Sequence, residues 1–418
     1  MNLLKLNEYG INIKLEIFRG LKYECILKNF IFSCNQNLGK EIFNKKKTCI
    51  RTLTNILASW MFTLYSNYDF NDDPFFPTDC SDTKNLRDTL INFCKFDKRI
   101  KDVNEKVDLI LNTLSKIYYS CLEELKTYKK SDENLKSTSN YTLKKVDKVF
   151  DREGKNKEFY KFIITHDFNI NLNRLSNIID NILIPKDVYI NLKNKYNGEE
   201  EYFDIYIWIM IYRYQLLGSN NNQLGVLPEN LLKMKDDFGL DFELFGSSVN
   251  FTLSNYCSLY YDIEKYFGSS GSFFNYKVEK GVYSLNPPYQ TDIITRGIER
   301  LLYFLDQNTL NFDDSNRLTF IITIPIWDNV GKKIMKYKHP EKKLIEEIDY
   351  GDFEIIKKIV NSKYYKLKLM ISKNDFTYLD HNFNLYKNST IQNTYIFVLS
   401  NDSKKDFSKL NEYNFKDY

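Results

Sequence analysis

The chain has 418 residues, of which 43% are hydrophobic and 16% aromatic, which excludes a disordered protein and leaves room for two domains. Lysine and arginine number 59 against 55 aspartate and glutamate residues. The resulting formal charge of +4 permits nucleic-acid binding without requiring it. The three histidines lie far apart and none of the seven cysteines forms a C-x-x-C pair, so we expect no metal site and no histidine-based triad.

The cysteine content and the lengths of the apolar runs limit the cellular locations that we expect for the protein. An odd number of cysteines predicts free thiols in a reducing, intracellular compartment, with nucleus and cytoplasm left open. Charges interrupt the first twenty residues, which is not the pattern of a secretory signal. The longest apolar run, at 205–212, is far shorter than the roughly 18 residues that span a bilayer, so no membrane segment is expected.

The first third of the chain is predicted to be helical. Apolar residues recur three and four positions apart in the segments 48–66, 83–96 and 107–128. The acidic, proline-containing stretch 71–82 separates the first two helices, and the polar stretch 127–145 is typical of a linker or loop. We therefore predict a helical domain over residues 1–150, followed by a second domain over residues 151–418.

From about Leu240 onward, short apolar runs alternate with helical segments, which is typical of an α/β fold with a parallel sheet. We expect strands near 240–250, 281–286 and 317–327, and a helix over 294–307. Two late strands, 364–371 and 393–400, fit an antiparallel pair at one edge. Five to seven strands are expected in this part of the chain.

The first candidate site is "FELFGSS", which follows the strand at 240. Ligands of open parallel sheets lie beyond the carboxyl ends of the strands. Glu243 offers a carboxylate there, and Gly246 allows close approach of a ligand to the backbone. We predict a cofactor loop made of Glu243, Phe245, Gly246, Ser247 and Asn250. The complete G-x-G-x-x-G fingerprint is absent, and a purely structural turn is the alternative.

The second candidate site is Asn286-Pro287-Pro288-Tyr289, directly after a predicted strand. Methylating an exocyclic adenine amine requires two acceptors that hold its hydrogens while its lone pair turns toward an electrophilic methyl group. The side-chain oxygen of Asn286 and the carbonyl of Pro287 are suited to this, since prolines present carbonyls rigidly. Tyr289 supplies an aromatic face on which a base can stack. The motif predicts adenine methylation, with a proline-rich strand end as the alternative.

Two further groups lie between these sites. Asp262, placed at the end of a candidate strand, is predicted to accept hydrogen bonds from ribose hydroxyls, with a solvated loop acid as the alternative. Gly271, Ser272, Phe273 and Phe274 are predicted to line the adenine of the cofactor. Each residue is ordinary when taken alone, and their order along the chain is what favours a joint role.

A family resemblance rests on blocks in colinear order between Tyr212 and Asp402. They include "RYQLLG", "ELFGSSVNF", "YCSLYYDIEKYFGSSGSFFNY", "SLNPPYQ", "FIITIPIW" and "STIQNTYIFVLSND". The chain resembles the phosphorylated-CTD-interacting-factor family, the cap-specific adenosine N6-methyltransferases. This resemblance implies a Rossmann-like methyltransferase domain beside a helical domain, and S-adenosylmethionine as methyl donor. The implied substrate is capped RNA, methylated at the adenosine, typically already 2′-O-methylated, next to the 7-methylguanosine cap.

The resemblance also assigns residues. Asn286, Pro287, Pro288 and Tyr289 would form the catalytic motif, which in the family more often ends in phenylalanine. Ile326 replaces the acid of an I-P-E-W block, while Trp327 remains as a candidate substrate contact. The first 59 residues contain no tryptophan. We therefore expect no WW domain, and with it no support for binding to the polymerase tail.

The phosphates of a capped RNA would need arginine or lysine contacts. Arg19, Arg51 and Arg213 are the candidates, and Arg213 is favoured because it lies inside the matched blocks. Two other functions remain open at this stage. One is adenine methylation on DNA or internal RNA sites, and the other is a catalytically inactive cap-binding or scaffold protein of the same fold.

Overall fold

The computed structural model divides the chain into two compact units, which are described separately. Unit 1 comprises Met1–Asn220 and Tyr260–Phe267, and unit 2 comprises Asn221–Leu259 and Gly268–Tyr418. The structure describes residues 12–39, 46–65, 73–95, 100–130, 141–152, 155–166, 172–218, 223–310, 317–325, 333–334, 347–348, 354–380, 387–389 and 393–416. Residues 151–220, which we expected in the second domain, cluster with unit 1.

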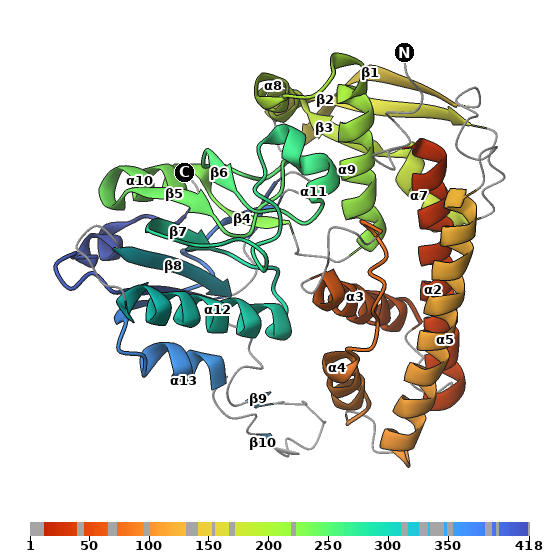
Figure 1. The fold of residues 1–418 in the computed structure, drawn as a ribbon, viewed down its shortest axis with the longest axis horizontal. Helices are drawn as coiled ribbons and strands as arrows, with labels where there is room; N and C mark the ends of the chain where they lie inside the picture. The colour runs from red at the N-terminus through yellow and green to blue at the C-terminus, as the bar shows by residue number, and fades with distance from the viewer. Residues whose placement is uncertain are drawn as a thin grey trace. The chain divides into compact units, whose positions relative to one another are not determined.

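Within the described residues, helices come first in unit 1 (Figure 1). They are α2 (Ile13–Leu38), α3 (Lys46–Tyr65), α4 (Lys84–Lys95) and α5 (Val103–Lys130). The last three confirm the helices predicted from apolar spacing. At the start of α2, the side chain of Asn12 accepts a hydrogen bond of 2.7 Å from the backbone N–H of Lys14, which satisfies a donor that the helix leaves unpaired.

A small antiparallel sheet follows these helices. It has the order β1–β2–β3, formed by Tyr141–Arg152, Lys155–His166 and Ile182–Pro185. The prediction of a linker over 127–145 is therefore wrong at both ends, because residues 127–130 belong to α5 and residues 141–145 belong to β1, while residues 131–140 lie outside the described chain. The hairpin of β1 and β2 was not predicted, because the many lysines of β1 give its sequence the polar composition that is typical of a loop.

Further helices follow in the described part of unit 1, and one of them is buried. They are α7 (Asn173–Asp180), α8 (Lys186–Lys195), α9 (Phe203–Leu217) and α11 (Tyr261–Glu264), with 3₁₀ turns at Glu200–Tyr202 and Lys265–Phe267. Helix α9 contains the apolar run 205–212 and is buried on nearly all sides, as expected for a helix without a polar face. It ends at Gly218, whose φ of 71° suits the left-handed cap.

Unit 2 is built on a six-stranded sheet with the order β11–β14–β8–β7–β5–β6. The strands are β5 (Leu240–Glu243), β6 (Asn255–Tyr256), β7 (Gly281–Leu285), β8 (Leu318–Pro325), β11 (Tyr365–Ile371) and β14 (Thr394–Ser400). Strands β6, β5, β7 and β8 run parallel. The antiparallel pair β14 and β11 completes one edge, which confirms both the parallel core and the predicted edge pair.

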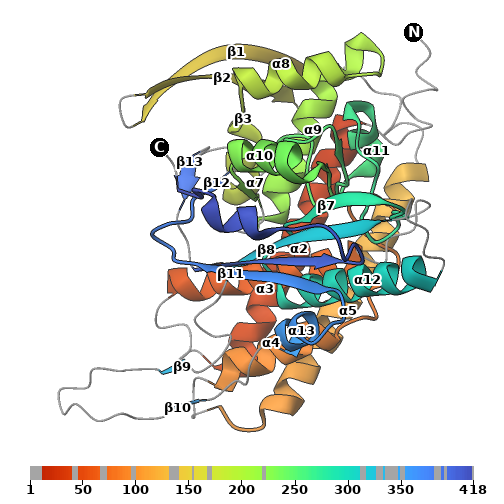
Figure 2. The same ribbon diagram turned by 90° about the vertical axis from the view of Figure 1, so that its left-hand side faces the viewer.

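Helices cover both faces of this sheet, as Figure 2 shows. Helices α12 (Thr291–Leu310) and α13 (Glu354–Val360) pack on one face, against a core that includes Phe320 and Ile322 of β8. On the other face, α10 (Pro228–Phe238) and a 3₁₀ turn at Ser408–Glu412 cover Ile321. Alternate residues of β8 thus point to opposite cores, as the pleat requires.

A second, smaller sheet belongs to unit 2 and bears on the site below. It has the order β13–β12–β4, formed by Lys387–Ser389, Tyr378–Asp380 and Leu224–Val226. A two-stranded pair, β9 (Lys333–Ile334) with β10 (Glu347–Ile348), is also present. The mixed α/β class predicted from the sequence is therefore correct.

Candidate functional site

The Asn286 loop, residues 286–289, begins directly after β7 ends at Leu285. The side-chain Nδ2 of Asn286 donates to the carbonyl of Leu224 at 3.0 Å, and the Tyr289 hydroxyl donates to Asn286 Oδ1 at 3.0 Å. The backbone N–H of Gln290 donates to the carbonyl of Pro288 at 2.7 Å and leads into α12. Among the described residues, no hydrogen bond engages the Pro287 carbonyl, so both predicted acceptors keep lone pairs available.

The loop after β5 leaves the sheet beside the Asn286 loop. Strands β5 and β7 are parallel neighbours, and the N–H of Leu244 donates to the carbonyl of Ser284 at 2.8 Å. The N–H of Gly246 donates to the carbonyl of Cys257 at 2.8 Å, and a Cβ on Gly246 would lie 3.4 Å from that oxygen. A side chain at this position would meet that oxygen at the edge of ordinary van der Waals contact, so the two backbone segments lie close together without requiring glycine. Both sites predicted from the sequence leave the carboxyl edge of the same sheet, where ligands of parallel sheets lie.

Hydrogen bonds link the polar residues of the loop after β5 to one another and to nearby backbone groups. One carboxylate oxygen of the buried Glu243 accepts the N–H groups of Thr252 and Leu253 at 2.6 and 2.7 Å. The N–H of Ser247 donates to Asn250 Oδ1 at 2.7 Å. These bonds fold the segment 243–253 over the strand end, so in this structure the side chains of Glu243 and Asn250 shape the loop.

Aromatic rings gather at the same edge of the sheet. The ring centroids of Phe245, Phe273 and Phe274 lie between 5.3 and 5.8 Å from one another. Phe273 is buried, whereas Phe245 and Phe274 are partly exposed and pack on the core from outside. The guanidinium of Arg296 lies over the Phe274 ring, 5.2 Å from its centroid. The structure therefore brings the predicted loop after β5 and the predicted Gly-Ser-Phe-Phe segment together.

The backbone around Gly271 and Ser272 forms a turn that positions these rings. The carbonyl of Gly271 accepts from the N–H of Ser258 at 2.9 Å, and Gly271 has a φ of 86°. The hydroxyl of Ser272 accepts from the N–H of Phe274 at 3.2 Å. Glycine is favoured at this positive φ because a side chain there is strained.

Asp262 and Arg213, predicted for two different roles, meet in unit 1. Asp262 lies in α11 and not at the end of a strand, so that placement was wrong. Its carboxylate receives a bidentate pair of hydrogen bonds from Arg213 Nη1 at 2.8 and 2.9 Å. Arg213 is fully buried and also donates from Nε and Nη2 to the two oxygens of Glu16, at 2.9 and 2.6 Å.

This ion-pair network extends further through unit 1. Glu16 also accepts from Arg19, whose Nε and Nη2 donate to Asp73 at distances of 2.8 to 3.2 Å. We name Glu16, Arg19, Asp73, Arg213 and Asp262 the Arg213 cluster. Burial alone would lower the pKa of the Arg213 guanidinium, but the carboxylates of Asp262 and Glu16 outweigh it and raise that pKa. Arg213 and Arg19, both phosphate candidates, are thus charged and engaged inside the unit.

The remaining candidates are placed as follows. Trp327 and Ile326 lie outside the described residues, and Arg51 lies on the exposed side of α3. Sequence reasoning missed Leu224 and Tyr378. The backbone carbonyl of Leu224 accepts the hydrogen bond from the Asn286 side chain. The ring centroids of Tyr378 and Tyr289 lie 5.7 Å apart, with an angle of 66° between the ring planes. No local motif marks a backbone acceptor, and only the strand pairing of β4 with β12 brings these residues to the site.

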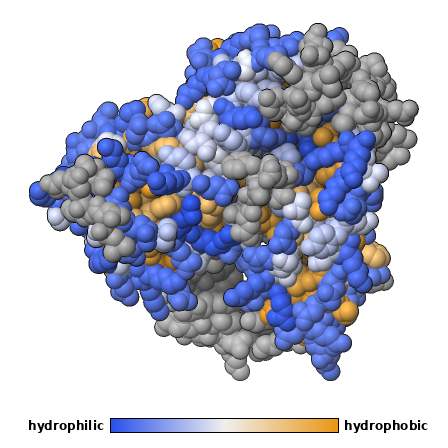
Figure 3. Space-filling model, in the orientation of Figure 1, coloured by the Kyte–Doolittle hydropathy of each residue, from blue (hydrophilic) through white to orange (hydrophobic). Residues whose placement is uncertain are grey.

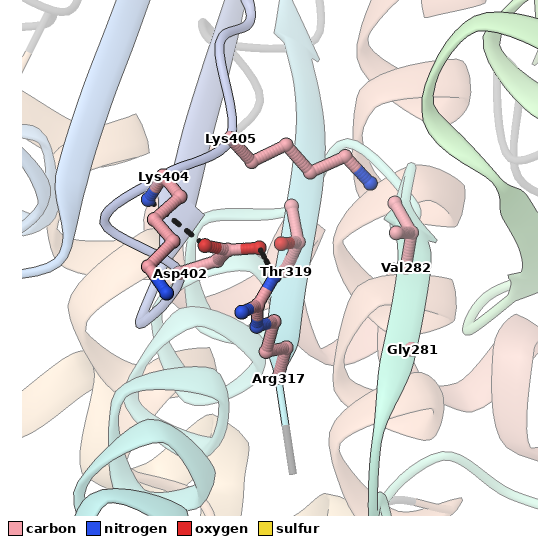
Figure 4. Close-up of a pocket in the computed structure, with 7 residues that line it drawn as sticks. All are labelled: Gly281, Val282, Arg317, Thr319, Asp402, Lys404 and Lys405. Atoms are coloured by element: carbon pink, nitrogen blue, oxygen red, sulfur yellow. Dashed lines mark hydrogen bonds and ion pairs between the residues drawn. The ribbon is translucent and has the colours of Figure 1, made fainter. Parts of the chain in front are cut away.

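A separate hollow of about 420 Å³ lies near the opposite end of β7, lined by Gly281, Val282, Arg317, Thr319, Asp402, Lys404 and Lys405 (Figure 4). Asp402 accepts from Arg317 Nη1 at 3.3 Å and from the N–H of Lys404 at 2.9 Å. The Nζ of Lys405 donates to the carbonyl of Phe238. Arg317 and Lys405 already hold protein acceptors, and the hollow lies at the amino ends of the strands, away from the Asn286 loop.

Within the described parts of the chain, no three histidine, cysteine or acidic side chains come together in a way that would hold a metal ion. Among the described helices, none combines the length and the apolar character that crossing a membrane requires.

On the face shown in Figure 3, hydrophilic residues predominate and hydrophobic ones are scattered. Among the residues coloured in that view, such scattering is normal for a protein surface.

These features define an α/β protein whose candidate site lies at the carboxyl edge of a parallel sheet. Residues 186–347 match the family model described as "Phosphorylated CTD interacting factor 1 WW domain". Two curated relatives, from Mus musculus and Homo sapiens, bear the name mRNA (2'-O-methyladenosine-N(6)-)-methyltransferase. Each is 28% identical over 127 residues, which is 29% of this chain and 17% of the relative. The alignment thus spans about a sixth of the relatives' length, and it supports a relationship to RNA methyltransferases.

One expectation is corrected by these comparisons. We expected no WW domain because tryptophan is absent from the first 59 residues. The family model that carries the WW description matches residues 186–347, a region that begins well beyond the segment on which that expectation rested. The expectation was therefore wrong.

Proposed function

We propose that the chain is an S-adenosylmethionine-dependent methyltransferase that methylates N6 of the adenosine next to the 7-methylguanosine cap of mRNA. The observation that carries this proposal is the arrangement of two loops. The Asn286 loop and the Phe245–Gly246 loop leave the carboxyl ends of neighbouring parallel strands, β7 and β5. In this proposal unit 2 is the Rossmann-like methyltransferase domain.

The chemistry assigned to the Asn286 loop is orientation of the target amine. Asn286 Oδ1 and the Pro287 carbonyl would accept the two hydrogens of the adenine N6 group. The nitrogen lone pair would then be turned out of the ring plane and toward the methyl donor. Neither acceptor takes a full proton during the step, so the rate gain comes from positioning and electrostatics.

The cofactor would supply a methyl group on a positively charged sulfur. In a direct in-line displacement the sulfur–carbon bond breaks as the nitrogen–carbon bond forms, and the surplus proton on N6 passes to water. Phe245 and Phe274, both partly exposed, are suited to hold an adenine ring, while Ser272 and Gly271 shape the turn beside them. Aromatic faces can receive both an adenine ring and a positively charged sulfonium, and one face of the Phe274 ring is already covered by the Arg296 guanidinium.

The choice of a capped RNA rests on the relatives, whose printed name specifies 2'-O-methyladenosine in mRNA. A nucleotide at the 5′ end is unpaired, so presenting its base would not require flipping it from a duplex. An aromatic face on Tyr289 is then sufficient to receive the base, with stacking that contributes about 1–3 kcal/mol.

The test is a transfer assay with labelled S-adenosylmethionine. Four RNAs are compared, capped or uncapped, each beginning with A or with G. We expect label only in the capped RNA that begins with A, recovered as N6-methyladenosine after digestion. Equal labelling of capped and uncapped A-initiated RNA would remove the cap from the proposal, and absence of label from all four would remove methyl transfer to RNA 5′ ends.

A further inference from the structure

The amide of Asn286 is held at both ends within unit 2. Its Nδ2 donates to the Leu224 carbonyl at 3.0 Å, and its Oδ1 accepts from the Tyr289 hydroxyl at 3.0 Å. Building on the proposed function, we propose that Tyr289 is a positioning residue whose hydroxyl holds the Asn286 amide in the orientation needed to receive the adenine amine. This role is separate from that of its ring as a surface for the base.

The orientation of the amide matters because its two ends have opposite hydrogen-bonding character. An amide oxygen has two lone pairs, so Oδ1 can accept from Tyr289 and from the adenine amine together. An amide turned by 180° would place Oδ1 against the Leu224 carbonyl, with two acceptors facing each other. It would also present N–H groups to an amine that itself donates. The Leu224 carbonyl therefore selects the orientation, and the Tyr289 hydroxyl restrains the end that meets the substrate.

Tyr289 is itself held by the small β13–β12–β4 sheet. Its ring contacts Tyr378 of β12 edge to face, and the Tyr378 hydroxyl bonds Thr394 Oγ1 of β14 at 2.8 Å. Tyr378 pairs in register with Val226 of β4, the strand that also supplies the Leu224 carbonyl. The same strand pair thus supports both contacts of Asn286, so the amide is oriented before any substrate binds.

The hydroxyl is a dependable donor at every pH at which the protein would be assayed. Burial raises the pKa of Tyr289 well above its ordinary value, and the neighbouring Tyr378 acts in the same direction. A phenylalanine at this position would keep the ring and its edge-to-face contact with Tyr378, but would lose the hydroxyl's bonds to Asn286 and to Tyr378. Removing the hydroxyl therefore separates its role from that of the ring.

The kinetic experiment compares Tyr289→Phe with the matched control Tyr283→Phe. Tyr283 lies on the same strand, β7, and its hydroxyl donates to the Lys280 carbonyl at 2.9 Å, away from the Asn286 loop. We expect Tyr289→Phe to lower kcat about fivefold, the effect of one ordinary hydrogen bond, with KM for S-adenosylmethionine unchanged. Tyr283→Phe should keep the kcat of the unmodified protein. An unchanged kcat in Tyr289→Phe, or an equal loss in both variants, would overturn the inference.

A second measurement does not depend on activity. The side-chain NH₂ signals of Asn286, identified by their disappearance in Asn286→Ala, report how firmly the amide is held. We expect two sharp, separate proton signals in the unmodified protein and broadened signals in Tyr289→Phe, with Tyr283→Phe unchanged. Signals unaltered by Tyr289→Phe would contradict the positioning role even if transfer occurs. If no RNA is methylated, the proposed function fails while this measurement still decides the inference.

Discussion

The Arg213 cluster of unit 1 and the Asn286 loop of unit 2 use polar side chains in opposite ways. Arg213 is fully buried, and its guanidinium donates hydrogen bonds to the carboxylates of Glu16 and Asp262. Asn286 is partly buried, is held by two neutral hydrogen bonds, and keeps acceptor capacity at Oδ1. The comparison teaches that a charged residue within a matched block can be fully engaged inside the protein, whereas an uncharged amide at a strand end keeps capacity to accept from a ligand.

The largest effect is expected from Arg213→Met. The substitution removes the arginine partner of Asp262 and one of the two arginines that pair with the buried Glu16, which should lower the free energy of unfolding by about 3–5 kcal/mol. Chemical denaturation followed by far-UV circular dichroism measures the loss. Arg87→Met is the control, because it breaks an exposed pair with Asp108 and should lose far less. Full stability in Arg213→Met would show that the cluster is not structural and would return Arg213 to the substrate candidates.

Asn286→Ala should have the next largest effect, and it should fall on activity alone. Removing one preorganised acceptor from the reacting amine is expected to lower kcat about 100-fold or more. The thermal midpoint should stay close to that of the unmodified protein, because Asn286 is only partly buried. Asn255→Ala, an exposed asparagine in the same unit, serves as the control for the loss of an amide. Retained transfer in Asn286→Ala would remove this residue from the mechanism.

Phe274→Ala tests the aromatic group formed with Phe245 and Phe273. If the ring holds the adenine of the cofactor, its loss should weaken S-adenosylmethionine binding about tenfold, in line with stacking of about 1–3 kcal/mol per base. Isothermal titration calorimetry measures the change. Tyr303→Ala, which removes an exposed ring on α12, should leave the affinity unchanged. Equal affinities for the two variants would place the cofactor elsewhere.

The smallest effect concerns pH and Asp73 of the Arg213 cluster. Burial alone would raise the pKa of the Asp73 carboxyl, but ion pairs with Arg19 and Lys129 outweigh it and hold that pKa well below its ordinary value. The stability that this carboxylate contributes is therefore complete above about pH 4 and is lost as pH falls toward the lower, folded-state pKa.

Asp73→Asn should flatten this dependence. The variant cannot lose an ionised carboxylate at that position, so its thermal midpoint should fall less between about pH 4 and pH 2 than that of the unmodified protein. Differential scanning calorimetry across this range provides the measurement. Asp108→Asn, on the exposed pair with Arg87, is the control. Parallel curves for Asp73→Asn and the unmodified protein would show that Asp73 does not set the acid response.

The sequence predicted much of the fold where local periodicity is strong. Helices α3, α5 and α12 and strands β7, β8 and β14 follow from apolar spacing, because each buries one face or both faces in a core. It failed where the local pattern is ambiguous. The lysine-rich strand β1 resembled a linker, and the segment around Asp262 resembled a strand although it forms α11.

The sequence by itself determined that an asparagine and two prolines follow a buried strand, since strand burial and the geometry of proline are local properties. Only the tertiary structure decided what surrounds them. The partner of Asn286 Nδ2 lies 62 residues away at Leu224, and the partner of Arg213 lies 197 residues away at Glu16. Hydrogen bonds and ion pairs depend on distances of about 3 Å and on exclusion of water, and both arise only when distant segments pack together.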